Sequence, residues 1–540
     1  MNRRPMKLAA WLAVAVSSLL IAGCGGGDDD NDDDAAPQRQ TGEVVSSQGV
    51  NGGDCASLFN LKLHQTTISY AALITPPFTP PGGGAAVSVP FCRVIGVSNP
   101  TSDSVINFEV WLPPAATWNR KFYSGTGGGS TGAIQFGALR TGIAANYAAM
   151  SQDRGHISRS DLGVPASTDG SWAAGHPEKV VDWAHRSQHV TTVASKAIVQ
   201  AFYTQAPQHA YFVGCSAGGH ISAMEAYRYP GDYDGIIAGA PAWNWSNLMA
   251  GRLWASHPSL KNPADALTAP KLAVLNDAAI ASCDAVDGLT DGIVDDPRKC
   301  SFDPAVLQCT GADAPTCLTP GQVNTARHIY AGPKRANGQQ VFPGYPVSSE
   351  RLWTVNTGPT PGGSSFDYFR YWVYENQNYD SRTFNFDSDL DFANNKPVAG
   401  DTMASVVNAR PDIRAFGDRG GKLLMWHGWA DEQVHALSSV DYHDQVVAAN
   451  TKAQADRFYR LFMLPGVAHC GGGVGPDSID ALGALERWVE QNVPPDRIIA
   501  SKVTGGTVTR TRPLCPYPQV ARYNGSGSID DAASFTCSTP

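Results

Sequence analysis

From about residue 55 onward, the hydrophobic and polar positions of the chain follow two different periods. Short apolar or alternating runs, typical of strands, occur in the segments 106–113, 121–132, 144–156, 233–242, 420–431 and 458–470. Apolar residues at helical spacing lie at 180–203 and 478–491, and segment 209–230 has the pattern of a strand, a tight turn and a helix. This order predicts an α/β fold with a mostly parallel sheet and helices on both faces.

The alternation stops from about Trp243 to Ile413. This span is rich in Trp, Tyr, Phe, Asn and Pro, and it contains four cysteines. We interpret residues 243–413 as an insertion that forms a lid or a small domain. Residues 46–242 and 414–540 then make up the core that carries the sheet.

The first residues have the pattern of a targeting signal. Arg3, Arg4 and Lys7 precede an apolar stretch that is too short for a stable membrane span, and "IAGC" at 21–24 resembles a bacterial lipobox. The resemblance implies a signal peptide at 1–23, cleavage before Cys24 and lipidation of that cysteine. An ordinary secretory signal is the alternative. Both predict export, the first as an outer-membrane lipoprotein held by an acidic, flexible tether at 24–45.

Composition narrows the possible partners. The 540 residues are 42% hydrophobic and 16% charged, as in an ordinary globular protein, and the formal net charge is -9. No basic block or basic helix face stands out, which argues against nucleic-acid binding. We expect a monomer whose only contact with a membrane is the lipid anchor at Cys24.

The segment "YFVGCSAGGH" (211–220) contains a Gly-x-Ser-x-Gly motif between a strand pattern and a helix pattern. This is the context of the nucleophile elbow of α/β-hydrolases, in which a strained turn presents a serine at the edge of the sheet. A purely structural glycine turn is the alternative. The context favours an α/β-hydrolase fold with a large inserted lid, and it favours Ser216 as a nucleophile.

The partners of a serine nucleophile follow it in the order acid, then histidine, in this fold. Asp431 lies in the turn after the strand pattern "KLLMWHG", and His469 lies in the loop after "FYRLFMLPG". We therefore predict a triad of Ser216, His469 and Asp431. His427 and His435 are rival bases, and Glu432 is a rival acid.

An ester-cleaving triad also needs backbone donors for the oxyanion. The N–H of Ala217, directly after the nucleophile, is the first predicted donor. The second is expected in the glycine-rich loop "SGTGGGSTG" (124–132), where we choose Gly129 over Gly128. A phosphate-binding loop is the competing interpretation, but the loop lacks the Lys-Ser/Thr pair and the Gly-x-Gly-x-x-Gly helix start of such sites.

Eleven cysteines leave ten once Cys24 is set aside, an even number that suits an exported protein. Sequence alone does not fix the pairing, but proximity suggests Cys283–Cys300, Cys309–Cys317, Cys515–Cys537 and Cys55–Cys92. Cys215 and Cys470 remain, beside the motif serine and the predicted base. If they pair, the disulfide closes a very long loop, which the chain-entropy account values at roughly 4–5 kcal/mol, and it fixes the two catalytic loops against each other.

The segment "CDAVDGLTDGIVDDPRKC" (283–300) holds five aspartates between two cysteines. Asp284, Asp287 and Asp291 interleave with glycines as in calcium loops, and the carbonyls of Leu289 and Ile293 would complete the shell. We predict a structural calcium ion in the insertion; a solvated acidic loop is the alternative.

Several segments together resemble the tannase and feruloyl esterase family: "YFVGCSAGGH", "YDGIIAGAPA", "CDAVDGLTDGIVD", "FGDRGGKLLMWHG", "LPGVAHC" and "RTRPLCPYPQVARYNGSG". The resemblance runs from about Cys55 to Cys537. It implies an α/β-hydrolase core with a lid, the five disulfides, calcium at the positions above, and Gly129 as an oxyanion donor.

The activity that this resemblance implies is hydrolysis of esters of aromatic carboxylic acids of the hydroxycinnamic or gallic type, by a serine carboxylesterase. The alternative is hydrolysis of terephthalate or phthalate monoesters, which requires a cation in the lid for the free carboxylate. Arg370 and Arg382 are the nearest candidates for that cation. A binding protein without turnover is a third reading, but no member of the triad is missing.

Overall fold

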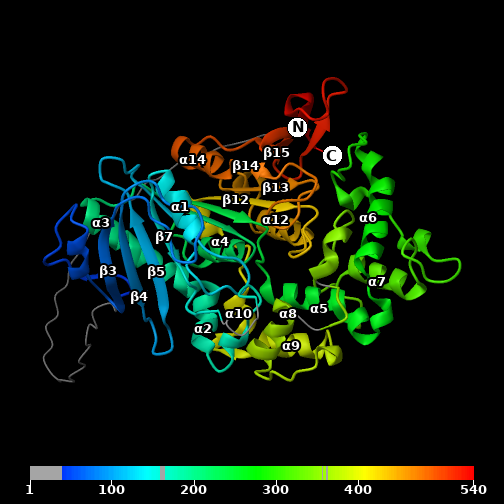
Figure 1. Cartoon of the computed structure of the whole chain (residues 1–540), viewed down its shortest axis with the longest axis horizontal. Coiled ribbons are helices and arrows are strands. Elements are labelled where there is room, and N and C mark those ends of the chain that lie inside the picture. Colours follow the sequence, from blue (N-terminus) through cyan, green and yellow to red (C-terminus); the bar gives the residue numbers. More distant parts are fainter. Residues whose placement is uncertain (1–38, 159–164, 356, 361–362, 540) are drawn as a thin grey trace, which may run out of the picture. The chain divides into compact units, whose positions relative to one another are not determined.

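A sheet of eleven strands runs through the part of the chain that the computed structural model describes, residues 39–158, 165–355, 357–360 and 363–539 (Figure 1). Its first strands are antiparallel, and β6, β7, β8, β9, β12 and β13 pair in parallel where they are neighbours. In sheet order the strands are β1 (Val44–Ser46), β2 (Lys62–Leu63), β3 (Thr66–Ile74), β4 (Phe91–Ser98), β5 (Ile106–Leu112), β7 (Ala148–Gln152), β6 (Lys121–Gly125), β8 (His209–Cys215), β9 (Gly235–Gly239), β12 (Lys422–Gly428) and β13 (Tyr459–Leu464).

Alternate residues of the central strands enter two different hydrophobic clusters, because successive side chains of a strand point to opposite faces of the sheet. In β12, Leu423 and Met425 belong to one cluster and Leu424 belongs to the other. The first cluster includes residues of α3 (Ser187–Tyr203), α4 (Ala217–Arg228) and α12 (Leu437–Ala449); the second includes residues of α1 (Phe136–Ala144) and α14 (Ala481–Gln491). Both faces are therefore covered by helices, which confirms the predicted α/β-hydrolase class.

Helix boundaries differ from the sequence pattern in two places. The predicted helix 180–203 is α2 (Pro177–Val181), a π-helical turn (Asp182–Arg186) and then α3. The segment 478–491 begins with the short strand β14 (Ser478–Ile479) before α14. The strand β14 pairs with β15 (Ile498–Thr504), which pairs with β16 (Thr507–Leu514); β17 (Val520–Tyr523) and β18 (Phe535–Ser538) form a separate pair.

The long segment between β9 and β12 is mainly helical and corresponds to the green and yellow helices of Figure 1. Its cluster of buried aromatic and aliphatic side chains includes Trp245 and Trp372, together with Trp172 and Trp183 from before α3. The segment is thus packed onto the core through a shared apolar cluster. Its elements are α5 (Trp245–Lys261), α6 (Ala269–Cys283), α7 (Pro320–Ala331), α8 (Ser364–Asp367), α9 (Ser388–Asn395), β10 (Pro397–Val398), β11 (Asp401–Thr402), α10 (Met403–Val407) and α11 (Arg414–Asp418).

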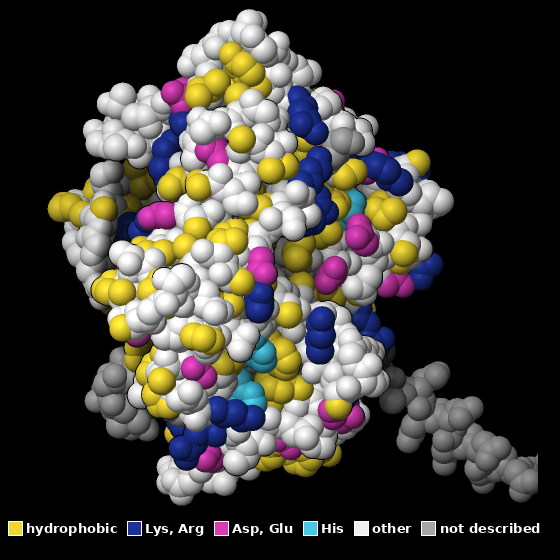
Figure 2. All heavy atoms as spheres, turned by 90° about the vertical axis from the view of Figure 1, so that its right-hand side faces the viewer, with side chains coloured by type: hydrophobic (Ala, Val, Ile, Leu, Met, Phe, Trp, Pro, Cys, Tyr) yellow, Lys and Arg dark blue, Asp and Glu magenta, His cyan; other side chains and the backbone are white. Residues whose placement is uncertain are grey.

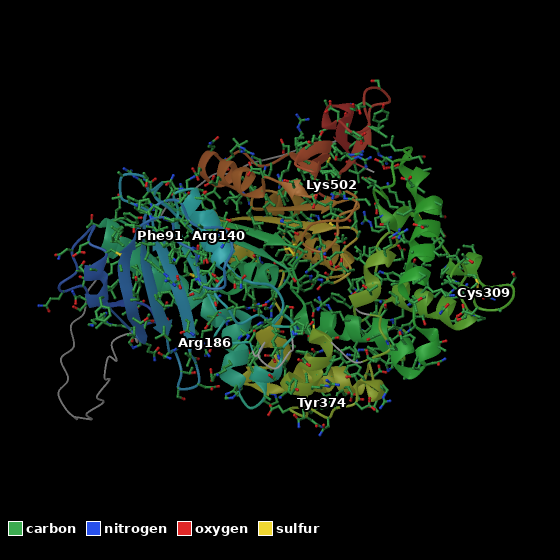
Figure 3. The ribbon with its side chains drawn as sticks, in the orientation of Figure 1. Phe91, Arg140, Arg186, Cys309, Tyr374 and Lys502 are labelled. Carbon is green, nitrogen blue, oxygen red and sulfur yellow. A yellow bond between two sulfur atoms is a disulfide. The ribbon has the colours of Figure 1, made fainter. Side chains whose placement is uncertain are left out.

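The structure contains all five disulfides that the sequence suggests, at Cys55–Cys92, Cys215–Cys470, Cys283–Cys300, Cys309–Cys317 and Cys515–Cys537. They differ greatly in the length of chain that they close. Cys215 and Cys470 are 255 residues apart in sequence, whereas Cys309, labelled near the right-hand edge of Figure 3, is 8 residues from Cys317. The chain-entropy account of disulfides therefore predicts that they contribute different amounts to the free energy of unfolding.

The predicted signal peptide, Cys24 and the tether up to residue 38 lie outside the described residues. Within the described part, no helix combines the length and the apolar character that crossing a bilayer requires. On the face that Figure 2 shows, basic and acidic side chains both occur among hydrophobic and neutral ones.

We expect the double substitution Cys215→Ala with Cys470→Ala to lower the free energy of unfolding by up to about 5 kcal/mol, because it removes the cross-link that closes the longest loop. The matched control, Cys309→Ala with Cys317→Ala, removes a disulfide that closes a loop of only 8 residues. It should lower the free energy of unfolding by about 2.5 kcal/mol. Denaturant unfolding under oxidising conditions measures both values. Equal losses in the two variants would contradict the loop-length argument.

Candidate active site

The turn between β8 and α4 places Ser216 in a strained backbone conformation, with φ 64° and ψ -122°. Such a conformation costs of order 1–3 kcal/mol and persists only where the surroundings fix it. Here the N–H of Ser216 donates to the carbonyl of Gly239 on β9 at 2.9 Å, and the carbonyl of Ser216 accepts from the N–H of His220 at 2.9 Å. The serine is therefore held at the carboxyl edge of the sheet, as the nucleophile elbow predicts.

Glycines around this turn are required by close backbone contacts. A Cβ atom at Gly214 would lie 2.2 Å from the carbonyl oxygen of Gly218, and one at Gly219 would lie 2.4 Å from that of Gly239. No side chain fits at these distances. The strand and the helix can therefore approach closely enough to form the elbow only with glycine at these positions.

A chain of hydrogen bonds connects three side chains that are far apart in sequence. Ser216 Oγ lies 2.8 Å from Nε2 of His469, and Nδ1 of His469 lies 2.8 Å from Oδ2 of Asp431. Because a carboxylate only accepts, Nδ1 carries the proton and donates to Asp431. Nε2 is then the acceptor for the hydroxyl of Ser216. The structure thus brings together the three residues that the sequence analysis selected.

Asp431 is fully buried and receives hydrogen bonds on both oxygens. Oδ1 accepts from the N–H groups of Gln433 and Val434, each at 2.8 Å, and Oδ2 accepts from His469 and from Nε2 of His427 at 3.1 Å. Burial alone would raise the pKa of Asp431, but the charge of His469 and the two histidine hydrogen bonds lower the pKa below its usual value. The carboxylate is therefore kept ionised inside the protein.

The rival side chains occupy other positions. His427 donates to Asp431 and to the carbonyl of Val434, and its Nδ1 lies 2.7 Å from Ser439 Oγ, so it supports the acid rather than contacting Ser216. His435 is bonded to the carbonyl of Pro343, and burial lowers its pKa to about 4. Glu432 accepts from the backbone N–H of His469 at 3.3 Å.

The disulfide between Cys215 and Cys470 joins the residues next to Ser216 and His469. Its two Cα atoms are 6.1 Å apart. Cys470 has a positive φ of 61°, so the loop after β13 bends at the point of attachment. The covalent link therefore limits how far the serine and histidine loops can separate.

The glycine-rich loop after β6 lies beside Ser216. A Cβ atom at Gly128 would be 3.6 Å from Cβ of Ser216. Gly129 has φ +59°, and a Cβ there would lie 2.3 Å from the carbonyl oxygen of Ser167. Ala217 is fully buried and is the first residue of α4, whose first N–H groups have no partner within the helix. Ala217 thus follows the serine directly, Gly128 lies against the serine, and Gly129 lines the same cavity as the serine.

Arg154 holds this loop in place, a role that the sequence analysis missed. Its Nη1 donates to the carbonyl of Gly129 at 3.2 Å, while Nε and Nη2 donate to the carbonyl of Trp183. The guanidinium lies 4.0 Å from the centre of the Trp183 ring. No local motif marks this contact, because Arg154 and Gly129 belong to different loops.

A cavity of about 540 Å³ opens at Ser216 and His469. The insertion contributes Trp245 and Arg252 of α5, together with Gly363 and Ser364. Neither Arg370 nor Arg382 is among the described residues that line it. Arg382 is 62% exposed and paired with Asp380. The remaining lining residues are Thr126, Gly127, Gly128, Gly129, Thr131, Gln135, Ser167, Thr168, Cys215, Gln433 and Cys470.

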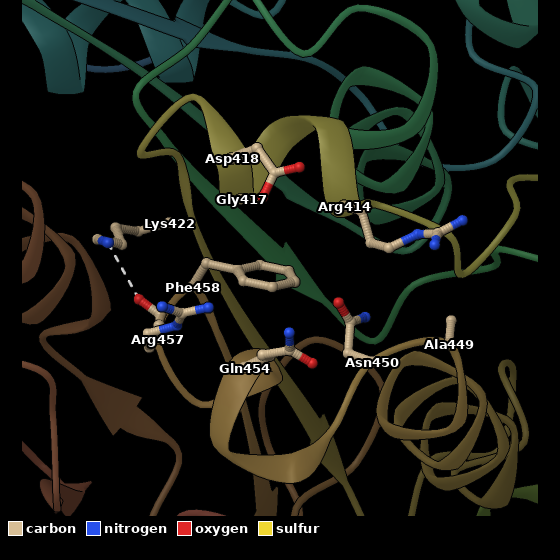
Figure 4. A pocket seen from close by; sticks show the side chains of 9 residues that line it. All are labelled: Arg414, Gly417, Asp418, Lys422, Ala449, Asn450, Gln454, Arg457 and Phe458. Atoms are coloured by element: carbon tan, nitrogen blue, oxygen red, sulfur yellow. Dashed lines mark hydrogen bonds between the residues drawn. The ribbon is translucent and has the colours of Figure 1, made fainter. Parts of the chain in front are cut away.

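A second cavity, of about 490 Å³, lies at the opposite edge of the sheet (Figure 4). Lys422 at the start of β12 and Phe458 just before β13 line it, together with Arg414, Asp418 and Arg457. None of the three triad residues takes part. In parallel strands, residues at the amino ends cannot reach side chains at the carboxyl ends, so this cavity is separate from the candidate active site.

The aspartates of the predicted calcium loop are engaged with protein donors. Asp284 accepts from the N–H groups of Asp291 and Gly292, and Oδ2 of Asp291 lies 2.7 Å from Nη2 of Arg512. Within the described residues, no three His, Cys, Asp or Glu side chains are arranged to hold a metal ion. Burial and the charge of Asp287 raise the pKa of Asp295 to about 7. Carboxylate and carbonyl oxygens are suitable ligands for calcium. In this structure, however, Asp284 is bonded to backbone N–H groups and Asp291 is paired with Arg512.

Comparisons with known proteins agree with this architecture. An uncharacterised esterase of Xanthomonas campestris pv. campestris is 37% identical over 530 residues, covering 89% of this chain and 91% of the relative. The mono(2-hydroxyethyl) terephthalate hydrolase of Piscinibacter sakaiensis is 34% identical over 507 residues, covering 81% and 82%. The crystal structure of feruloyl esterase B from Aspergillus oryzae superposes with a TM-score of 0.82 at 28% identity, covering 90% of this chain and 99% of that one.

The family model for tannase and feruloyl esterase matches residues 92–538. This range spans the sheet from β4 onward, the nucleophile elbow, the insertion and the loops after β12 and β13. The chain therefore belongs to the tannase and feruloyl esterase family and is a carboxylic ester hydrolase.

Proposed function

We propose that the protein is an exported serine carboxylesterase that cleaves esters of aromatic carboxylic acids through an acyl-enzyme on Ser216. The observation that carries this proposal is the hydrogen-bond chain from Ser216 Oγ through His469 to the buried carboxylate of Asp431, with 2.8 Å at each step. A serine, an imidazole and an ionised acid in this order form the arrangement that makes a hydroxyl nucleophilic.

In the acylation step, Ser216 Oγ attacks the ester carbonyl carbon while Nε2 of His469 takes the hydroxyl proton. The N–H groups of Ala217 and Gly129 stabilise the negative charge on the carbonyl oxygen of the tetrahedral intermediate. The bond to the alcohol oxygen then breaks, and His469 gives its proton to that oxygen. The alcohol leaves, and the acyl group remains on Ser216.

In the second step, His469 takes a proton from a water molecule that attacks the acyl carbon. The bond between the acyl carbon and Ser216 Oγ breaks, and the proton returns to Oγ as the carboxylic acid leaves. Asp431 stabilises the imidazolium in both steps and keeps Nδ1 protonated. The Cys215–Cys470 disulfide keeps the donor and acceptor loops at a working distance.

The acyl group that suits this cavity is planar and aromatic. Trp245 lines the cavity and offers an aromatic surface for such a group. A feruloyl esterase among the similar structures supports hydroxycinnamic esters, and the match to the tannase and feruloyl esterase family model supports gallic-type esters as well. The buried cation Arg252 in the same cavity favours a second candidate, hydrolysis of terephthalate or phthalate monoesters, as does the name of the Piscinibacter relative.

Two further properties belong to this proposal. The five disulfides suit an oxidising compartment, which supports export, with the signal peptide at 1–23 and lipidation of Cys24 as the means of anchoring. A calcium ion bound by Asp284, Asp287 and Asp291, with the carbonyls of Leu289 and Ile293, would stabilise the insertion and take no part in the chemistry.

Substitution of Ser216 by Ala tests the proposed chemistry directly. Wild type and Ser216→Ala are compared on methyl ferulate, methyl gallate, mono(2-hydroxyethyl) terephthalate and a short-chain aliphatic nitrophenyl ester. We expect the wild type to cleave an aromatic ester best, and the variant to lose at least about 10³-fold in kcat. Turnover by Ser216→Ala at the wild-type rate would exclude Ser216 as the nucleophile.

Gly129→Ala should reduce kcat by about 10²- to 10³-fold, the cost of losing one oxyanion donor. The added methyl group lies within 2.3 Å of the Ser167 carbonyl oxygen and requires a left-handed φ, so the loop must move. The matched control is Gly175→Ala, which has a similar φ of +74° but open space around the added Cβ. If both variants lose the same activity, backbone strain rather than the oxyanion loop is responsible.

Removal of calcium tests the acidic loop. If the loop binds the ion, EDTA should lower the melting temperature by several degrees, and added calcium should restore it, because a ligand bound only to the folded state stabilises it. Asp287→Asn should abolish this response. An identical melting curve with EDTA and with calcium would favour the solvated acidic loop.

A further inference from the structure

Asp431 contacts two histidines, and only one of them belongs to the triad. Its Oδ2 atom accepts from Nδ1 of His469 at 2.8 Å and from Nε2 of His427 at 3.1 Å. His469 continues to Ser216, whereas His427 is completely buried and is not among the described residues that line the active-site cavity. One carboxylate oxygen is therefore shared between the proposed base and a second imidazole.

The neighbours of His427 determine which of its nitrogens donates to Asp431. Nε2 faces two atoms that only accept, Oδ2 of Asp431 and the carbonyl oxygen of Val434 at 3.0 Å, so Nε2 carries a hydrogen. Nδ1 lies 2.7 Å from the hydroxyl of Ser439 near the start of α12, which donates to Nδ1 in this tautomer. The hydrogen-bond chain of the active site thus continues beyond the acid, through His427 to Ser439.

A strand residue holds the inner side of the carboxylate. His427 lies on β12, where it pairs with Met463 of β13. The segment after β12 turns back, so that Val434 accepts from His427 and donates its own N–H to Oδ1 of Asp431 at 2.8 Å. Side chains on strands position their partners more precisely than side chains on loops. The carboxylate therefore has a fixed donor on the side that faces away from His469.

The donor at His427 changes the balance of charge at Asp431. Burial raises the pKa of Asp431, whereas the charge of His469 and the hydrogen bonds from His427 and His469 lower it. A hydrogen bond from His427 thus stabilises the carboxylate while it competes with His469 for the same oxygen. If this donor is removed, the carboxylate attracts the imidazolium form of His469 more strongly. His469 then keeps its second proton to a higher pH, and in that form it cannot act as a base.

The charge of Asp431 also acts on three other ionisable side chains. Burial and the charge of Asp431 raise the pKa of Glu432, which accepts from the backbone N–H of His469. Burial lowers the pKa of His435 to about 4 and lowers the pKa of Arg252 on α5, and in both cases Asp431 acts against burial. These groups are identical in proteins that differ only at His427, so their effects cancel when such proteins are compared.

We propose that His427 is a positioning residue of the triad: by donating to Oδ2 of Asp431, it limits how strongly the acid holds the imidazolium of His469, and it thereby extends activity to lower pH. Ser439 supports this role by keeping His427 in the tautomer that donates to Asp431. The inference rests on the proposed esterase function and adds the pH range in which that function is available.

Two amide substitutions separate the donor from the rest of the side chain. The amide nitrogen of Gln reaches the position of Nε2, so His427→Gln keeps a donor for Asp431. The shorter Asn in His427→Asn leaves its amide near the position of Nδ1 and loses that donor. The pH dependence of kcat/KM is measured from about pH 4 to pH 9 for the neutral ester of the panel that the wild type cleaves best, because its acid limb reports the protonation of the base in the free enzyme.

We expect the acid limb of His427→Asn to lie about 0.5–1 pH unit above that of the wild type, as for the loss of one hydrogen bond to a charged group. His427→Gln should keep the acid limb of the wild type. On the plateau, kcat of His427→Asn should fall by no more than about 10-fold, because Asp431 retains His469 and two backbone N–H groups as donors.

The matched control is His435→Gln. It makes the same substitution at a second buried histidine of this segment, which is bonded to the carbonyl of Pro343 and not to Asp431. The acid limb should stay at the wild-type position in this variant. An equal shift in His435→Gln would show that any change in this segment alters the pH dependence, and it would overturn the inference.

Two results with His427→Asn would also overturn the inference. Loss of kcat without a shift of the acid limb would mean that His427 only supports the fold, and a shift to lower pH would contradict the proposed direction. If His427→Asn does not fold, Ser439→Ala is measured in its place. A smaller shift to higher pH then supports the inference, whereas an unchanged acid limb overturns it.

Proton NMR gives a readout that does not depend on turnover. The low-field signal of the His469 Nδ1–H is titrated in Ser216→Ala, with and without His427→Asn, and its midpoint should move to higher pH by the same amount as the acid limb. An unmoved midpoint would contradict the role of His427. Failure of the esterase proposal looks different: the wild type would hydrolyse no ester of the panel faster than Ser216→Ala does, while the NMR midpoint would still respond to His427→Asn.

Discussion

The parallel pairing of β8, β9, β12 and β13 is the constraint on which the active site depends. In register, Cys215 pairs with Gly239 and Gly239 pairs with Trp426, so these strands end at one edge of the sheet. The loops that follow them carry Ser216, Asp431 and His469. More than 250 residues separate the serine from the histidine in sequence, and it is the shared edge that places their side chains 2.8 Å apart.

Much of this arrangement could be predicted because its signals are local. The strand, the glycines and the start of the helix around Ser216 can each be recognised from the sequence pattern. The acid and the base follow segments that have a clear strand pattern. The even number of cysteines and their positions beside the predicted nucleophile and base suggest a Cys215–Cys470 disulfide, which the family resemblance also implies. The fold class follows from the alternation of strand and helix, since each buried face imposes its period on the residues that form it.

Other features had no such signal. Arg154 reaches the carbonyl of Gly129 from a neighbouring loop, and His427 proved to be a donor to Asp431. Arg252 projects from a helix of the insertion, where the chain lacks the regular alternation. In the acidic loop, Arg512 arrives from 221 residues away. Contacts of this kind depend on tertiary packing. They join residues at no regular spacing along the chain, so a single sequence does not reveal them.

Helix α5 has a consequence for how such enzymes diversify. Each residue of a helix turns it by about 100°, so inserting or deleting one residue between the start of α5 and Arg252 would swing the guanidinium away from the cavity while leaving Trp245 in place. The chain segments that carry the triad lie outside α5 and would keep their positions. Recognition of the substrate can therefore be altered by a rotation of one helix, separately from the chemistry at the serine.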